Sequence, residues 1–224
     1  MAIAFDAFTA GTTGSGQSSI TFSKTCTGAD RFLIVSVTTF NFSSGTPSPT
    51  ATYNGVTMTI VAQNVVAFNV NNWRVHQFYL KAPASGANNV VVTATTGTGW
   101  FRAVASSYTG VDQTSPLLTS RTANATSGNT MQVSLTTSED AWWAISGANV
   151  DGNWTAGGNT GTIRHPDGSY GFADSNSVIS ATTGNAQMSH LGSRGYGGIA
   201  IAFKPAGAAP DPAQAARRGV VMMM

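Results

Sequence analysis

The sequence predicts an all-β protein in which two antiparallel sheets pack into a β-sandwich. Short apolar or alternating segments follow one another, separated by clusters of Gly, Pro, Asn and Ser, which is the spacing of strands and turns. No helical period is sustained before the C-terminal tail. Only 9% of the residues are charged, against about 25% in an ordinary soluble domain, so uncharged polar residues supply most of the polar surface.

The expected strands are short and closely spaced. In chain order they cover Ile3–Phe8, Ser19–Lys24, Phe32–Phe42, Thr50–Tyr53, Val56–Val61, Val65–Val70, Trp73–Lys81, Asn89–Thr96, Phe101–Tyr108, Met131–Thr136, Trp142–Val150 and Ile199–Lys204. This many short strands require two packed sheets. We therefore expect residues 1–205 to form one domain.

Two local patterns define the sandwich most clearly. Both alternating faces of the Phe32–Phe42 segment are apolar at its start, so this strand is expected at the centre of a sheet. One of its faces would lie against the second sheet and the other under loops. Asn54-Gly55 separates two strand segments and predicts a type I′ hairpin, because both central positions of that turn need positive φ.

The segment from Gly147 to Gly198 is different in composition. Gly-rich runs occur at Gly152–Gly158 and Gly192–Gly198, and we expect long loops there, at one end of the sandwich. Loops in that position usually carry binding surfaces. No internal repeat is evident in the sequence.

Residues 206–224 are expected to form an extended arm. Ala206–Gly219 is an Ala- and Pro-rich linker with no core of its own, and the apolar end that follows it could anchor the chain by burial in a partner. The alternative is a frayed tail without a role. The candidate anchoring residues are Arg217, Arg218, Val220, Val221, Met222, Met223 and Met224.

Charge and cysteine content exclude several classes of protein. The net charge is +2 and the basic residues are dispersed, so the electrostatic footprint of a nucleic-acid-binding protein is absent. No apolar run reaches the roughly 20 residues that span a bilayer. The first residues lack the pattern of a secretory signal, so we expect synthesis in a host cytoplasm. Cys26 is the single cysteine and is expected as a small buried apolar residue.

The sequence contains no motif that indicates catalysis or metal binding. Glu139 is the single glutamate, and His76, His165 and His190 are far apart without metal-ligand spacing. We expect His76 at an outward or rim position of its strand. The segment His165–Gly168 reads His-Pro-Asp-Gly, which is typical of a turn. The chain is therefore predicted to have no enzymatic activity, no metal and no cofactor.

Aromatic residues near Gly-rich segments are the remaining candidates for a binding site. Flat rings beside Asn, Asp and Gln side chains can stack on sugars, and the alternative is that these rings fill the open ends of the sandwich. Trp142 and Trp143 must point to opposite faces of their strand, so one is expected in the core. The candidate glycan or partner contacts are Trp100, Trp154, Tyr170 and Phe172.

Four segments carry a resemblance to a known family. They read TYNGVTMT from Thr52, KAPASGANNVVVT from Lys81, SYTGVDQTSP from Ser107 and GIAIAFKP from Gly198. Over most of residues 1–205 the chain resembles the concanavalin-like, jelly-roll β-sandwich domains of tailed-phage structural proteins and bacterial surface proteins. The resemblance implies a jelly-roll fold and a virion or surface setting, with no catalytic residues to transfer.

Composition and resemblance together favour a bacteriophage virion structural protein, either a head decoration or a fibre subunit attached through its termini. The expected partners are other virion proteins of the capsid or tail and further copies of this chain, without nucleic acid or membrane. The alternative is a carbohydrate- or receptor-binding adhesion module that uses the loop aromatics to contact a host surface glycan. A hydrolase ranks third, because no pair of carboxylates stands out in the sequence.

Overall fold

The computed structural model describes residues 2–42, 48–65, 73–149, 153–167, 169–192 and 195–207. These residues contain no helix, and their strands form four antiparallel sheets. The expected all-β antiparallel sandwich is confirmed, with four sheets where two were expected. Within the described ranges, no helix has the length and hydropathy needed to cross a membrane.

The strands before residue 110 form two of the sheets, which we call the N-terminal half. Its inner sheet has the order β1-β9-β3-β7-β6 and its outer sheet the order β2-β8-β4-β5. The bounds are β1 Ala4–Thr12, β2 Ser19–Cys26, β3 Phe32–Phe40, β4 Thr50–Tyr53, β5 Val56–Thr57, β6 Thr59–Val65, β7 Arg74–Lys81, β8 Gly86–Thr93 and β9 Trp100–Thr109.

The strands after residue 116 form the other two sheets, the C-terminal half. Its inner sheet has the order β10-β17-β12-β15-β14 and its outer sheet the order β11-β16-β13. The bounds are β10 Leu117–Ala125, β11 Thr130–Thr136, β12 Trp142–Ala148, β13 Trp154–Gly158, β14 Thr162–His165, β15 Tyr170–Asp174, β16 Thr183–His190 and β17 Tyr196–Phe203.

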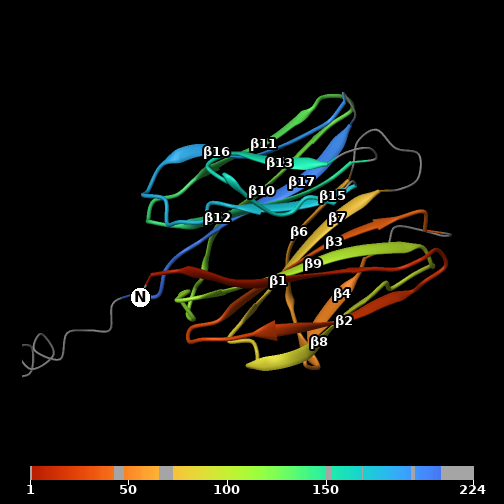
Figure 1. Ribbon diagram of the computed structural model, residues 1–224, viewed down its shortest axis with the longest axis horizontal. Helices are drawn as coiled ribbons and strands as arrows, with labels where there is room; N and C mark the ends of the chain where they lie inside the picture. Colours follow the sequence, from red (N-terminus) through yellow and green to blue (C-terminus); the bar gives the residue numbers. More distant parts are fainter. Residues whose placement is uncertain are drawn as a thin grey trace, which may run out of the picture.

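The four sheets are stacked as layers, with the two inner sheets facing each other and an outer sheet on each side (Figure 1). Phe32 and Phe203 share the central apolar cluster between the inner sheets. Leu33 belongs to the core of the N-terminal half. Trp142 joins the central cluster and Trp143 the core of the C-terminal half, so these two side chains point to opposite faces, as expected. β3 is buried along its whole length because sheets cover both of its faces, where loops had been expected on one.

The two halves have the same strand order. Replacing β1, β3, β6, β7 and β9 by β10, β12, β14, β15 and β17 converts one inner sheet into the other. Replacing β2, β4 and β8 by β11, β13 and β16 does the same for the outer sheets, and only the two-residue β5 has no counterpart. In each half the last strand of that half lies in the inner sheet between the first and third strands of that half.

The first irregularity in the pairing also occurs in both halves. β1 has a bulge at Asp6, directly after the residue that pairs with Tyr108. β10 has a bulge at Leu118, directly after the residue that pairs with Phe203. Tyr108 and Phe203 hold the same register position, because each pairs with the first residue of the central strand, β3 or β12.

A second bulge is shared by the opposite edges of the inner sheets. Val61 is the extra residue in β6 and Arg164 the extra residue in β14. Each follows a Thr-Ile pair, Thr59-Ile60 or Thr162-Ile163. Bulges are specific features of a fold and do not recur by chance at matched positions. The two halves are therefore a structural duplication of one strand arrangement, although no internal repeat is evident in the sequence.

The interface between the halves follows an approximate twofold axis. The rings of Tyr108 and Phe203, which are equivalent residues, meet with centroids 5.0 Å apart. Phe32 contacts Phe203 at 5.1 Å, and its equivalent Trp142 contacts Tyr108 at 5.7 Å. Exchanging equivalent residues maps each of these contacts onto another, which is the property of an isologous dimer interface. The two halves thus face each other as the subunits of a twofold dimer do.

The Gly-rich segment expected as long loops is largely strand. β13, β14, β15 and β16 all lie between Gly147 and Gly198, so the loop prediction is wrong there. Gly147, Gly171 and Gly198 form a row across β12, β15 and β17. A Cβ atom at Gly147 would come within 2.5 Å of the Met131 methyl group. The glycines are needed because large side chains of the outer sheet occupy this space: Met131, Trp154 and Met188.

Two local predictions are confirmed and one is wrong. Asn54 and Gly55 connect β4 to β5 with φ values of 49° and 76°, as the type I′ hairpin requires. Cys26 is free and buried. His76 was expected at an outward position, but its side chain is fully buried in the core because both faces of the inner sheet are covered.

The two ends of the described chain lie together. The Ala206 N–H donates a hydrogen bond to the Gly110 carbonyl over 2.8 Å. Gly110 has a φ of 70°, and a Cβ atom there would collide with the Ala2 carbonyl. The first and last described segments of the chain therefore meet beside the junction of the two halves.

Candidate ligand site between the two halves

The aromatic residues expected to contact a glycan are mostly interior. Trp154, Tyr170 and Phe172 are 2%, 1% and 0% exposed, so their rings offer no surface on which a sugar could stack. The prediction that these three rings are exposed is wrong. Their burial supports the alternative that the rings fill the interior of the sandwich. Trp100 is partly buried and stacks on Phe40 with centroids 5.6 Å apart.

Two further predictions fall outside the described residues. The expected strand Val65–Val70 is described only at its first residue. The anchoring residues of the arm lie entirely beyond the described range: Arg217, Arg218, Val220, Val221, Met222, Met223 and Met224.

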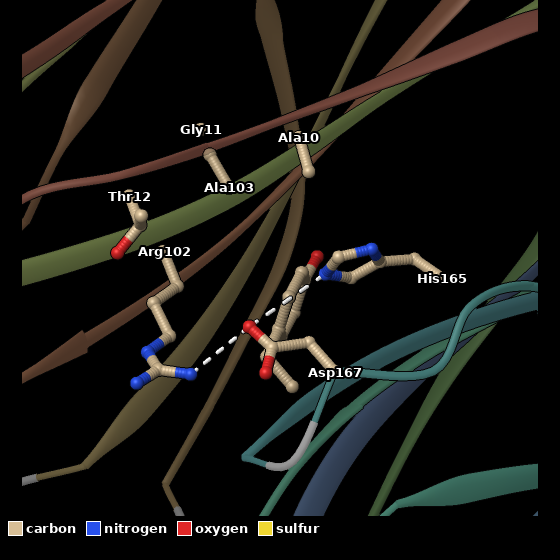
Figure 2. A pocket seen from close by; sticks show the side chains of 8 residues that line it. Ala10, Gly11, Thr12, Arg102, Ala103, His165 and Asp167 are labelled. Carbon is tan, nitrogen blue, oxygen red and sulfur yellow. Dashed lines mark hydrogen bonds and ion pairs between the residues drawn. The ribbon is translucent and has the colours of Figure 1, made fainter.

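A cleft lies between the halves where the approximate twofold packing is incomplete. β6 packs against β10 and β17 of the opposite half. The backbone of its equivalent, β14, approaches β1 and β9 less closely over the described ranges. The resulting cavity of about 170 Å³ (Figure 2) we call the inter-half cleft. It is lined by Ala10, Gly11, Thr12, Arg102, Ala103, His165, Asp167 and Tyr170.

An ion pair crosses the inter-half cleft (Figure 2). Arg102, from β9, donates a hydrogen bond from Nη1 to Oδ2 of Asp167 over 3.0 Å. The Nε2 atom of His165, at the end of β14, lies 3.9 Å from the same oxygen. The Arg102 and Asp167 side chains are 28% and 41% exposed. Ion pairs this exposed contribute only about 0–1 kcal/mol to stability, so these charges matter more for a ligand than for the fold.

His165 adds polar groups to the cleft without adding charge. Burial lowers its pKa below the ordinary value of 6.5, and the Arg102 guanidinium lowers it further against the opposing effect of Asp167. The imidazole is therefore neutral at pH 7. A neutral imidazole has one nitrogen that donates and one that accepts.

β1 forms the wall of the cleft that belongs to the N-terminal half. Phe8, Ala10 and Thr12 alternate along this strand and share the face directed at the cleft. Gly11 faces the other way, where a Cβ atom would meet the Phe22 ring at 2.8 Å. Phe8 is 44% exposed, and its ring lies 6.3 Å from that of His165. An accessible aromatic ring therefore stands beside the polar groups.

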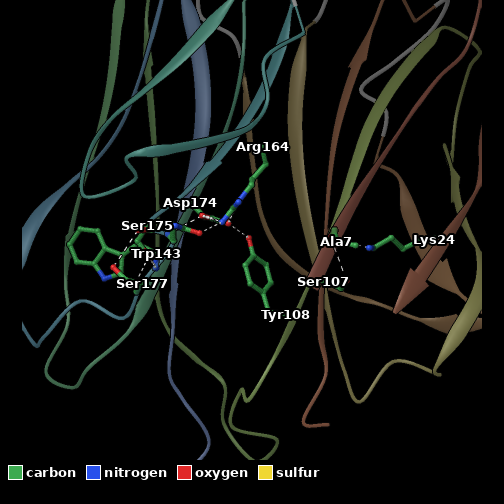
Figure 3. Close-up of polar contacts among 10 residues, drawn as sticks. Ala7, Lys24, Ser107, Tyr108, Trp143, Arg164, Asp174, Ser175 and Ser177 are labelled. Carbon is green, nitrogen blue, oxygen red and sulfur yellow. Dashed lines mark hydrogen bonds and ion pairs between the residues drawn. The ribbon is translucent and has the colours of Figure 1, made fainter. Parts of the chain in front are cut away.

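A buried polar network fixes the opposite wall (Figure 3). Asp174 is fully buried and accepts two hydrogen bonds of 2.9 Å from the guanidinium of Arg164. The Tyr108 hydroxyl, from the other half, donates to Asp174 over 3.0 Å. Burial raises the pKa of Tyr108 far above its ordinary value, so the hydroxyl keeps its proton. The Arg164 guanidinium also lies over the Phe5 ring at 3.8 Å, so β14 is tied to the N-terminal half.

A second polar group holds β1 in place from the outer sheet (Figure 3). Lys24 is 1% exposed, and its Nζ donates to the Ala7 carbonyl over 2.9 Å. Burial lowers the pKa of Lys24. Next to it, Asp6 accepts hydrogen bonds from the Thr27 N–H and the Ser107 hydroxyl over 2.9 and 2.7 Å. The bulge in β1 is thereby fixed, and with it the position of the cleft wall.

The inter-half cleft contains groups that can hold a polar ligand by non-covalent binding. It offers a carboxylate, a guanidinium, a neutral imidazole and a hydroxyl beside an aromatic ring. In the part of the chain that the structure describes, no three His, Cys, Asp or Glu side chains are grouped as metal ligands would be. Arg102 and Asp167 already satisfy each other in part, and hydroxyl-bearing ligands can insert between such groups.

Sequence reasoning named three residues of the cleft, Tyr170 as a candidate glycan contact and His165 and Asp167 for other reasons, and missed the others. His165 and Asp167 were interpreted as part of a turn, and they do follow the end of β14. Their partner Arg102 is 65 positions from Asp167 and belongs to the other half. No local pattern connects residues so far apart, and the duplication that brings them together was not recognised.

The comparisons with protein-family models, curated proteins and solved structures found no match to the chain.

Proposed function

We propose that the chain is a structural protein of a bacteriophage particle, displayed as a head decoration or fibre subunit and attached to other virion proteins through its termini. The observation that carries this proposal is the meeting of Ala2 and Ala206 at Gly110. Attachment segments at both ends would leave from one point of the molecule. The loops at the far ends of the halves would then be displayed.

The outer surfaces support an assembly role. The exposed residues of β2, β8, β11 and β16 are all uncharged. Across β11 and β16, Gln132 donates to Gln187 over 3.0 Å and the hydroxyls of Thr136 and Thr183 lie 2.9 Å apart. Such a surface can pack against a neighbour without burying an ionised group, which is the most costly part of forming a polar interface.

The carboxylates also support a structural role. Asp112 accepts hydrogen bonds from the N–H groups of Thr114 and Ser115, and Asp174 is committed to the ion pair with Arg164. These two carboxylates hold backbone or neighbouring side chains in place. This is the use of acidic residues expected of a protein without an enzymatic activity.

Truncation of the arm tests the proposal. The chain lacking residues 208–224 should fold, because Ala206 and its bond to Gly110 are retained, and should be depleted about tenfold or more from purified particles if several arms act together. Quantitative mass spectrometry of the particles gives the copy number, and an Arg121→Ala variant on exposed β10 is the matched control. Absence of the full-length protein from particles would overturn the proposal. Normal incorporation of the truncated chain would show that the arm is not the anchor.

A carbohydrate- or receptor-binding adhesion module is the second candidate. The observation that favours it is the inter-half cleft, where an exposed aromatic ring, Phe8, lies 6.3 Å from the ring of His165, and His165 in turn lies near Asp167. Of the aromatic residues expected from the sequence, Tyr170 alone lines this cleft. A displayed subunit can also carry such a site, so the two functions are compatible.

A further inference from the structure

We propose that the inter-half cleft binds a single ring of a neutral saccharide, with Asp167 and Arg102 bonded to its hydroxyls and Phe8 against its apolar face. This inference rests on the second candidate function and assigns it a ligand class and a site. It shares only Tyr170 with the candidate residues expected from the sequence, and it places the site between two halves instead of on loops.

The charge balance of the cleft favours an uncharged ligand. Arg102 and Asp167 lie 3.0 Å apart and neutralise each other, and His165 carries no charge at pH 7 because burial lowers its pKa. A phosphate, sulfate or carboxylate would have to compete with Asp167 for the one guanidinium. A neutral ligand with several hydroxyls makes hydrogen bonds with both charged groups and separates no charge.

The polar groups match the dual character of sugar hydroxyls, each of which donates and accepts. Arg102 bonds to Oδ2 of Asp167, which leaves Oδ1 to accept from a hydroxyl. The guanidinium of Arg102 has further donors beside the one that bonds to Asp167. Thr12 supplies a hydroxyl from the facing wall. Neighbouring hydroxyls of one ring can therefore be engaged from both halves.

The apolar part of the site also fits a sugar ring. Phe8 is 44% exposed and shares its strand face with Ala10, whose small side chain leaves room over the floor of the cleft. The C–H face of a sugar packs on an aromatic ring while its hydroxyl edge remains hydrogen-bonded. Phe8 and the Arg102–Asp167 pair thus address the two different faces of such a ligand.

The volume of the cleft limits how much of a ligand it can hold. Its volume is about 170 Å³, whereas pockets for drug-sized ligands are roughly 300–1,000 Å³. At about 30 Å³ for each water molecule in the liquid, the space corresponds to about six waters. One monosaccharide ring fits this space, and the rest of a longer glycan would lie in solvent.

Saturation-transfer NMR and titration with defined sugars test the proposal on the full chain. The neutral probes are glucose, galactose, mannose, rhamnose, N-acetylglucosamine and N-acetylgalactosamine, and the charged probes are glucuronic acid, N-acetylneuraminic acid and inorganic phosphate. We expect at least one neutral sugar to bind with a Kd in the millimolar range or below. The Asp167→Asn and Phe8→Ala variants should each weaken this binding by about tenfold or more, a loss of about 1.4 kcal/mol.

Matched variants outside the cleft control for the substitutions. Glu139→Gln removes a carboxylate from an exposed ion pair with Lys204, and Ile60→Ala removes an exposed apolar side chain from the other edge of the same sheet. Both should bind the sugar as the parent does. Circular dichroism checks that all four variants keep the β-sheet fold.

Three outcomes overturn the inference: none of the neutral sugars binds, binding survives both cleft substitutions, or only the charged probes bind. The particle experiment separates this result from the structural proposal. Asp167→Asn should leave the copy number on particles unchanged, and removal of residues 208–224 should leave sugar binding unchanged. A failure of either proposal is therefore seen without affecting the other.

Discussion

The two halves differ at three neighbouring positions in the middle of each inner sheet. The N-terminal half has Val37, Ala103 and His76 there. The C-terminal half has Gly147, Gly198 and Gly171 at the matching positions. Strand order, register and two bulges are the same around these positions. At these positions the inner sheet of the N-terminal half contributes side-chain volume. In the other half, Met131, Met188 and Trp154 of the outer sheet contribute it.

The same strand arrangement therefore allows either the inner or the outer sheet to supply the side chains that fill the core. A core needs a total volume packed at high density, and that volume can come from either of two facing sheets. The two halves are therefore sensitive to different changes. The N-terminal half has a buried titratable group at His76, and the C-terminal half has glycines that tolerate no side chain.

The largest effect is expected from breaking the ion pair that only the C-terminal half has. At the bulge occupied by Arg164 the N-terminal half has Val61, and at the position of Asp174 it has Tyr79. Asp174→Ala leaves a guanidinium that is largely buried without its carboxylate, so we expect a loss of about 3–5 kcal/mol in the free energy of unfolding. Chemical denaturation measures it. Replacing both partners, Arg164→Met with Asp174→Leu, should recover most of the loss, and no recovery would contradict the assigned role.

A smaller effect, limited to acid, is expected in the N-terminal half. Burial lowers the pKa of His76 to about 3, below the ordinary value of about 6.5. Between these two values the unfolded chain binds a proton that the native chain does not, so stability falls as the pH is lowered. From pH 7 to pH 4 the contribution of His76 is about 3 kcal/mol.

The His76→Leu variant isolates that contribution. His165 and His190 also have lowered pKa values and act in the same direction, so part of the acid sensitivity should remain. Urea unfolding at pH 7 and pH 4 gives the difference for each protein. Hydrogen exchange should show that β3 and β7 lose protection at low pH before β12 and β15, where Gly171 replaces His76. An equal pH dependence in variant and parent would refute the prediction.

The smallest effect is expected from importing a side chain of one half into the other. Gly147→Val copies Val37, but its Cβ would lie 2.5 Å from the Met131 methyl group and 3.1 Å from the Trp154 ring. Overpacking of this kind costs about 1–3 kcal/mol. A second substitution, Met131→Ala, should restore part of the loss because it empties the space. If Gly147→Val unfolds at the same denaturant concentration as the parent, the volume argument is wrong.

The sequence was sufficient for features that are local. Asn54-Gly55 predicted its hairpin because a type I′ turn depends on two residues, and the double-sided apolar pattern from Phe32 placed β3 at the centre of a sheet. The number of layers was not predictable in the same way. A strand covered by a sheet and loops has the same apolar pattern as a strand covered by two sheets.

The duplication and the cleft depend on contacts that no local pattern records. Val37 and Gly147 hold the same register position yet share no side-chain property, so their equivalence appears only when the strands are paired. The Gly-rich segments resembled loops because glycine weakens a strand in isolation, while here it admits the side chains of a facing sheet. Arg102 and Asp167 meet only because the two halves are packed.

The contacts at Gly110 relate the order of the two halves along the chain to the folded structure. Ala2 and Ala206 both lie beside Gly110, so the path from residue 2 to residue 206 is nearly a closed ring that passes once through each half. Neighbouring ends are the condition under which proteins tolerate circular permutation. A chain that began at Leu117, with residue 207 joined to residue 2, would trace the same contacts in the opposite order of halves. Which half is synthesised first is then a property of the gene and not of the folded protein.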